Sequence, residues 1–241
     1  MKFLRKIYNK GLQIVVNSII VLVIAVSYLL FLLPERTITI SKGEDDAIYY
    51  GDKDLKRVSL MFNVYENKEV VYSILEVLKS KGVKATFFMG GCFADDNKEL
   101  LVKIANDGHE LANHGYFHKD HKKLSIEENK KEIFNTEQVI KSLTGVKTNL
   151  FAPPSGSFSK STLIASKELG YKVIMWSKDT IDWRDSDQKL IFNRATKNLE
   201  NGDLVLMHPK EHTLLALPKI IDFYIESGFS VVTVSENIGG V

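Results

Sequence analysis

Residues 57–89 read RVSLMFNVYENKEVVYSILEVLKSKGVKATFFM, and the change of pattern within them decides the fold class. The β-branched and aromatic run at 58–64 predicts a buried strand, and the apolar spacing of 69–80 predicts an amphipathic helix. Gly82 follows that helix as a C′ glycine, and 85–89 predicts a second strand. A strand, a helix and a second strand in this order indicate parallel strands joined by a crossover helix.

The same alternation continues to the end of the chain, and glycines follow most of the predicted helices. The predicted strands lie at 58–64, 85–89, 110–113, 150–152, 172–176, 204–207 and 230–234, and the helices at 69–80, 97–106, 126–143, 160–168, 189–199 and 214–227. Seven strands alternating with six helices favour an α/β fold with a parallel sheet, closed or nearly closed as a (β/α) barrel. In such barrels the chemistry lies at the carboxyl ends of the strands.

The composition fits one folded domain and excludes several classes of function. The chain has 241 residues, of which 44% are hydrophobic and 26% charged, as is typical of a globular protein. Its net charge of +2 lacks the basic excess of a general nucleic-acid-binding protein. The single cysteine, Cys92, excludes an internal disulfide and a cysteine-rich metal site.

The N-terminus predicts a basic cytoplasmic tail at 1–10 and a transmembrane anchor at 11–34. Within the anchor, 12–33 reads LQIVVNSIIVLVIAVSYLLFLL, and this uncharged run at ~1.5 Å per residue spans a hydrocarbon core of about 30 Å. The basic flank predicts a single-pass protein of the cell membrane whose later residues are exported. The alternative is a signal peptide cleaved at the small residues 25–27. The rest divides into a polar stalk and a folded domain, at 35–55 and 56–241.

Two histidine-containing segments follow predicted strands. NHGYFH at 113–118 comes after the third strand, and its H-x-x-x-H spacing lets two imidazoles converge on one metal ion. LMHP at 206–209 comes after the sixth strand, where His208 can act as a general acid. The alternatives are a pair of surface histidines and an ordinary strand end.

Two further strand ends carry aromatic, acidic and proline residues. WSKDTIDWR at 176–184 combines aromatic rings with carboxylates, which suits a sugar pocket because aromatic faces pack on sugar rings. FAPPSG at 151–156 predicts a rigid turn that shapes a groove. The alternatives are an aspartate pair that caps the next helix and a turn that only ends a strand.

Together these segments resemble the polysaccharide deacetylases, the NodB homology domain of carbohydrate esterase family four. The resemblance covers about 56–236 and rests on N-H-x-x-x-H at 113–118, D-x-x-D-W at 179–183, L-x-H at 206–208 and K-A-T-F-F at 84–88. It implies a distorted seven-stranded barrel that removes acetyl groups from chitin-like or peptidoglycan sugars. The pattern is most similar to degenerate, sporulation-associated members of the family.

The resemblance also implies a role for each site residue. His114 and His118 would hold a divalent cation, with Zn²⁺ the expected ion. His208 would be the general acid, and Asp182 would raise its pKa. The sugar would contact Trp183, Pro154, Tyr116 and Leu206. The expected partner is therefore a cell-wall or spore-wall polysaccharide.

The family's first motif, T-F-D-D-G, is altered in this chain. Its general base aligns with Asn63 and its metal-ligating aspartate with Val64, and an arginine of its third motif aligns with Ala152. An amide does not take up a proton as a carboxylate does, and valine has no donor atom, so the metal site would be weakened or absent. Asn63 would orient water or substrate, and Glu66 in the same loop is the candidate replacement carboxylate.

Two functions remain open from the sequence. The first is a metal-dependent hydrolase that deacetylates an N-acetylated cell-wall glycan, peptidoglycan or chitin-like, at a non-peptide carbon–nitrogen bond. The second is a catalytically impaired pseudoenzyme of the same fold that binds glycan. A ligand-free anchored scaffold is the least favoured alternative, because it would leave Asp182, Trp183 and His208 without a purpose.

Overall fold

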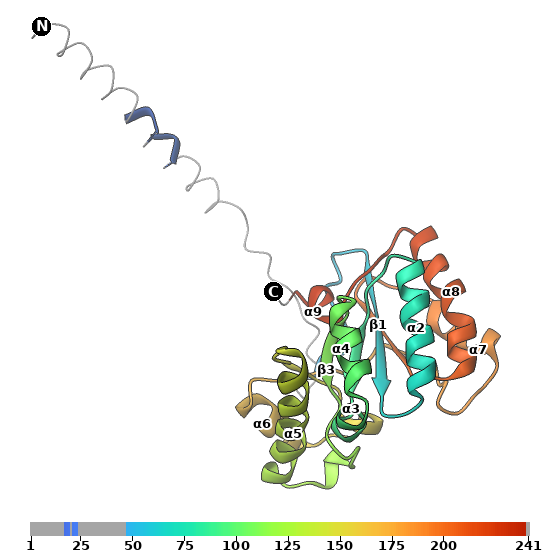
Figure 1. The fold of residues 1–241 in the computed structure, drawn as a ribbon. Helices are drawn as coiled ribbons and strands as arrows, with labels where there is room; N and C mark the ends of the chain where they lie inside the picture. The colour runs from blue at the N-terminus through green and yellow to red at the C-terminus, as the bar shows by residue number, and fades with distance from the viewer. Residues whose placement is uncertain (1–16, 20, 24–46, 240–241) are drawn as a thin grey trace, which may run out of the picture. The chain divides into compact units, whose positions relative to one another are not determined.

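The computed structural model describes residues 17–19, 21–23 and 47–239 (Figure 1). The expected basic tail, most of the expected anchor and residues 35–46 of the expected stalk therefore lie outside the described residues. Among the helices of the described ranges, none combines the length and the apolar character needed to cross a membrane.

Residues 47–239 form an α/β fold around one parallel sheet (Figure 1). The strands are β1 (Arg57–Val64), β2 (Thr86–Met89), β3 (Glu110–Asn113), β4 (Leu150–Phe151), β5 (Lys172–Val173), β6 (Lys178–Asp179), β7 (Asp203–Met207) and β8 (Ser230–Val231). The sheet follows the path β5-β4-β3-β2-β1-β7-β6, and β8 also pairs with β1. All of these pairs are parallel, as the sequence predicts.

The two ends of this path are close together, so the sheet is curled. β5 and β6 occupy opposite ends, yet only residues 174–177 separate them in the chain. A segment of this length reaches at most ~17 Å between the strands. The seven strands of the path therefore form a curled, open (β/α) half-barrel, in which the carboxyl ends of the strands face a common cleft.

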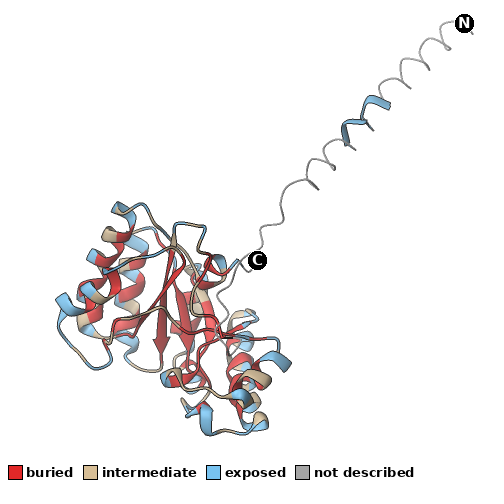
Figure 2. Cartoon of the chain, turned by 180° about the vertical axis from the view of Figure 1, so that it is seen from behind, coloured by how far each residue is buried: buried red, intermediate tan, exposed pale blue. Residues whose placement is uncertain are grey.

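Helices pack around the outside of the sheet (Figure 1). The α-helices are α2 (Lys68–Ser80), α3 (Gly91–Asp96), α4 (Lys98–Asn106), α5 (Ile126–Thr144), α6 (Lys160–Glu168), α7 (Gln188–Thr196), α8 (Glu211–Glu226) and α9 (Val234–Asn237), with 3-10 turns at His121–Lys123 and Pro154–Gly156. Ser125 and Glu128 form a capping box that starts α5, and Gly145 in the left-handed region ends it. Figure 2 shows the buried strands inside and the exposed outer faces of the helices.

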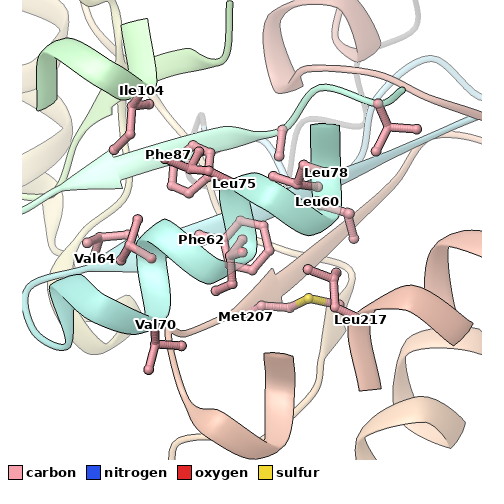
Figure 3. Close-up of a cluster of buried hydrophobic side chains, with 14 of the residues drawn as sticks. Leu60, Phe62, Val64, Val70, Leu75, Leu78, Phe87, Ile104, Met207 and Leu217 are labelled. Carbon is pink, nitrogen blue, oxygen red and sulfur yellow. The ribbon is translucent and has the colours of Figure 1, made fainter. Parts of the chain in front are cut away.

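The alternation of side chains along β1 separates the core from the cleft. Phe62 and Val64 point toward the helices, where both are fully buried in the main hydrophobic cluster (Figure 3). Phe62 stacks on Phe87 of β2 with 5.3 Å between ring centroids. Met61 and Asn63 point to the other side, since successive side chains of a strand face opposite ways. β1 thus delivers Asn63, and not Val64, to the inside of the half-barrel.

The structure differs from the sequence prediction at several places, and it adds the short helices α3 and α9, which were not predicted. The strand predicted at 172–176 ends at Val173 and the chain then crosses to β6, which periodicity did not indicate because it is only two residues long. The strand predicted at 230–234 ends at Val231. Residues 47–55, expected as stalk, pack on the domain: Ala47 is fully buried, and Ile48 bridges to Ile174. The domain boundary predicted at residue 56 thus falls inside the folded part.

Candidate functional site

A cleft of about 260 Å³ opens at the carboxyl ends of the strands. It is lined by Asn63, Tyr65, His114, His118, Ser155, Trp176, Asp179, Trp183, Leu206 and His208. These residues come from the loops after β3, β4 and β5, and from β1, β6 and β7 with the loops that follow them. Segments far apart in the sequence, including both histidine segments, therefore meet at one mouth of the half-barrel, as the sequence predicted for a common site.

His208 is held by a buried carboxylate. Its Nδ1 lies 2.7 Å from Oδ1 of Asp182, and its backbone N–H donates to Oδ2 of the same residue over 2.7 Å. Thr213 donates a third hydrogen bond of 2.7 Å to that Oδ2. Burial by itself raises the pKa of Asp182, but the hydrogen bonds and charge of His208, with the bond from Thr213, outweigh it and lower the pKa overall. Asp182 is therefore an anion that fixes the His208 ring, with Nε2 left for the cleft.

The other two imidazoles form an aromatic cluster with Tyr65. The ring centroids of His114 and His118 lie 5.2 Å apart, and the ring centroid of Tyr65 lies 4.1 Å from that of His118. Nδ1 of His114 donates to the carbonyl of Ala152 over 2.7 Å, which leaves its Nε2 as an acceptor. Burial, with His118 adding to it, lowers the pKa of His114, so this ring is neutral.

A glutamate on α5 holds the loop that carries these histidines. One carboxylate oxygen of Glu132 accepts the backbone N–H groups of Tyr116 and Phe117 at 3.0 and 2.7 Å. Its other oxygen pairs with Lys119 at 2.9 Å, and its side chain is only 5% exposed. The loop geometry therefore depends on a buried charge that a sequence pattern does not reveal.

The donor atoms of the site do not fit a catalytic metal centre. Such a centre usually has three protein ligands, and His114 and His118 supply two. Val64 packs among apolar side chains on the helix side, and Glu66 is paired with Lys210. Within 47–239 and the six described N-terminal residues, no three His, Cys, Asp or Glu side chains are grouped so that they could hold a metal ion.

Asn63 lies in the floor of the cleft with an incompletely satisfied amide. It is 2% exposed, and within residues 47–239 its Oδ1 has no hydrogen-bond partner. Ala152, which aligns with the family's arginine, is fully buried in the inner cluster that includes Met61 and Leu206. The charged pair expected from the family is therefore replaced by a neutral amide and a methyl group.

Two residues predicted to touch substrate lie elsewhere. Tyr116 is turned toward α3, where Gly91 leaves space for its ring, and Pro154 is buried at the start of its 3-10 turn. Neither belongs to the cleft lining, because the Tyr116 ring packs on α3 and Pro154 belongs to the buried part of the turn. Leu206 and Trp183 do line the cleft, and Trp183 is 54% exposed.

Several lining residues were not singled out from the sequence. Tyr65 follows Asn63 by two positions and so shares its side of the chain; this spacing was a usable signal. Trp176 and Asp179 lie in the segment already noted for a sugar pocket. Gly156 leaves room for Trp176, because a Cβ at this glycine would lie 2.7 Å from the indole ring. No sequence pattern pointed to Thr213, because this residue reaches Asp182 only through the packing of α8.

The loops around the cleft hold strained backbone. Ser155, Ile181 and His118 have φ of +55°, +55° and +52°, in the left-handed region. This region costs non-glycine residues roughly 1–2 kcal/mol each, and for a β-branched residue such as Ile181 it is an outlier. Ser155 and His118 line the cleft, and Ile181 directly precedes Asp182. Strain concentrated around one cleft is typical of a binding or catalytic site.

Comparison with protein families and relatives agrees with this geometry. Residues 50–174 match the family model described as polysaccharide deacetylase. The uncharacterized protein YlxY of Bacillus subtilis strain 168 is 36% identical over 193 residues, which cover 80% of this chain and 60% of that protein. A peptidoglycan-N-acetylglucosamine deacetylase of Bacillus cereus strain ATCC 14579 is 32% identical over 190 residues, covering 77% of this chain and 69% of the relative.

A solved structure of the same family is also similar to this chain. The protein BA3943 of Bacillus anthracis, described as a CE4 family pseudoenzyme, is 35% identical and superposes with a TM-score of 0.77 over 80% of this chain and 68% of its own. A mutant of that pseudoenzyme is described as having restored enzymatic activity. The chain thus spans about 60–70% of the length of these relatives.

Proposed function

The chain belongs to the polysaccharide deacetylase family, and we propose that its cleft binds an N-acetylated cell-wall glycan with little or no deacetylation. The observation that carries this proposal is the division of the cleft. Its chemical centre lacks the base and the third ligand expected from the family, whereas aromatic rings line its wall and the loops around it are strained.

The replaced centre argues against efficient hydrolysis. Removal of an acetyl group needs a group that accepts a proton from the attacking water, and the amide of Asn63 does not do so. Members of the family are in general metal-dependent, and a bound cation would polarise the acetyl carbonyl. His114 and His118 alone are an incomplete ligand set for that cation.

The remaining walls suit a sugar. Trp176 and Trp183 present aromatic faces, Leu206 an apolar floor, and Asp179 and His208 polar atoms at the edge. A few convergent polar groups in an otherwise apolar cleft are the usual composition of a small-molecule site. The peptidoglycan sugars that the relatives are named for, together with this lining, support an N-acetylated peptidoglycan chain as the ligand.

A second candidate function is residual deacetylation, and the His208–Asp182 pair favours it. Asp182 accepts three hydrogen bonds, two of them from His208, whose Nδ1 is engaged while the residue itself lines the cleft. An imidazolium in this position can donate a proton to a departing amine. The residue that would protonate the departing amine is therefore retained, although the base that would activate the attacking water is replaced by Asn63.

We further propose that 11–34 anchors the chain in the cell membrane, with the domain outside. The basic residues of 1–10 before an uncharged run of 22 residues support this orientation. Alkaline extraction of membranes, with protease added to intact and to permeabilised cells, tests it. Release of the chain by alkali, or protection of the domain until permeabilisation, would contradict the proposal.

Calorimetric titration tests the proposed function. The full-length chain, purified in detergent, is titrated with tetra-N-acetylchitotetraose and with soluble peptidoglycan fragments, before and after EDTA treatment. We expect binding that survives EDTA and weakens in Trp183→Ala, with no acetate released above the blank even when Zn²⁺ is added. Acetate release over many turnovers would establish the second candidate instead, and it should then disappear in His208→Gln. Absence of binding to either glycan would refute glycan recognition.

A further inference from the structure

The rings of His114 and His118, the histidine pair, are spaced as two ligands of a single ion would be. Their centroids lie 5.2 Å apart, and the ring planes form an angle of 66°. Two imidazoles bound tetrahedrally through nitrogens about 2.0–2.1 Å from an ion have centroids about 5 Å apart. Nδ1 of His114 donates to Ala152, so its Nε2 carries the lone pair that an ion requires. The spacing of the pair thus suits a metal ion, although a third ligand is missing.

The ring of Tyr65 lies against both imidazoles. Its centroid is 4.1 Å from that of His118 and 6.2 Å from that of His114. An ion held by both imidazoles would lie about 3.2 Å from each of their centroids, and the three centroid distances then place it about 3–6 Å from the centroid of Tyr65. A further ligand between ion and ring needs about 5.5 Å, which is a bond of about 2 Å and a van der Waals contact of about 3.5 Å. Over most of that range no ligand fits.

The backbone around Tyr65 is held from two sides. Gly90 makes room on one side, because a Cβ at this glycine would lie 3.2 Å from Cβ of Tyr65. On the other side, Asn67 has a left-handed φ of +58°, and its side chain donates to the carbonyl of Pro209 over 3.0 Å. The ring can therefore leave the histidine pair only by rotation of the side chain, which breaks its contact with His118.

Tyr65 also departs from the first motif of the family. The motif T-F-D-D-G aligns its two aspartates with Asn63 and Val64, which places its glycine at Tyr65. A glycine has no side chain that could cover the histidine pair. The change at position 65 thus adds a ring beside the pair, while the change at position 64 removes a ligand.

We infer that Tyr65 closes the histidine pair to metal ions, so that the pair serves as an aromatic wall of the cleft and not as a cation site. The metal ion that the family implies then fails to fit for two separate reasons, a missing third ligand and an occupied ligand space. Restoring a ligand alone would leave the site closed. The inference does not depend on glycan binding, because it concerns only the two imidazoles and the ring beside them.

Copper titration tests this closure, because Cu²⁺ binds nitrogen ligands more tightly than the other divalent first-row ions do. The full-length chain, purified in detergent without a histidine tag, is titrated with Cu²⁺ and followed by visible absorption and calorimetry. Tyr65→Ala and Tyr65→Gly should each bind one more Cu²⁺ per chain than the wild type, and adding His118→Ala should remove it. Tyr65→Phe keeps the ring and should bind copper as the wild type does.

Three results would overturn the inference. A copper equivalent that the wild type binds and His118→Ala removes would show that the ring leaves the pair open, and this comparison needs no change at Tyr65 if those variants fail to fold. Loss of that equivalent in Tyr65→Phe would make the phenol a ligand. An unchanged copper count in Tyr65→Ala and Tyr65→Gly, with thermal melting showing that the fold is kept, would show that the ring is not the barrier.

Discussion

Replacement of Asp182 by asparagine tests the best-defined interaction of the cleft. Asp182 accepts three hydrogen bonds of 2.7 Å, from the backbone and the ring of His208 and from Thr213, and it is 1% exposed. Asparagine keeps the size of the side chain but turns one of its two acceptor atoms into a donor. In one orientation the amide N–H faces the backbone N–H of His208, and in the other it faces Nδ1, so that the imidazole must take the tautomer in which Nδ1 accepts.

The expected loss of stability follows from these contacts. Hydrogen bonds to a charged group contribute about 1.5–3 kcal/mol each, and breaking a buried charged pair costs about 3–5 kcal/mol. We therefore expect Asp182→Asn to lower the free energy of unfolding by about 3–5 kcal/mol, or Tm by about 6–20 °C for a domain of this size. Thr213→Val, which removes one donor only, should cost about 1.5–3 kcal/mol.

The contribution of Asp182 to the free energy of unfolding should also decrease as the pH falls. The pKa of Asp182 is lower in the folded than in the unfolded chain, so its contribution is complete above the unfolded value of about 3.9 and is lost as the pH falls through the folded value. Chemical denaturation of wild type and both variants between neutral pH and pH ~3 measures this. A loss below about 1 kcal/mol at neutral pH would refute the description of Asp182 as a buried, fully bonded anion.

Three other predictions concern residues around the cleft and in the core. Glu66→Gln should leave zinc binding in equilibrium dialysis unchanged and should alter the free energy of unfolding by no more than about 1 kcal/mol, because Glu66 is paired with Lys210 where both are partly exposed. A clear loss of bound zinc in this variant would instead identify Glu66 as a ligand. Glu132→Gln should lower the free energy of unfolding by about 1–3 kcal/mol in chemical denaturation, and it should weaken glycan binding because the loop 114–118 loses its anchor. An unchanged glycan affinity would show that other contacts hold this loop. Burial lowers the pKa of His109 to about 4, so the folded state should lose about 3 kcal/mol as the pH falls from about 7 to about 4, and a His109→Gln variant that keeps the same slope would contradict this.

Much of the fold follows from local patterns in the sequence. The apolar periodicity of 58–64 and 69–80 depends on neighbours a few residues away, and the structure confirms both elements and the parallel order. The crossing from β5 to β6 was not predicted, because β6 has only two residues and therefore no measurable period. The packing of Ala47 and Ile48 on the domain was also missed, because the polar residues that follow them resemble a linker.

The candidate site was predictable as far as strand ends could be located. His114, His118 and His208 meet in one cleft because parallel strands place their carboxyl ends together. The direction of each side chain was not predictable from motif order alone. Tyr116 turns away from the cleft, and Thr213 reaches Asp182 from α8, since both depend on the packing of helices against the sheet.

The most direct test of glycan recognition is a crystal structure of the protein with tetra-N-acetylchitotetraose. We predict one sugar in the cleft, with its ring against Trp183. Oligosaccharide bound elsewhere on the surface, with this cleft empty, would contradict the account.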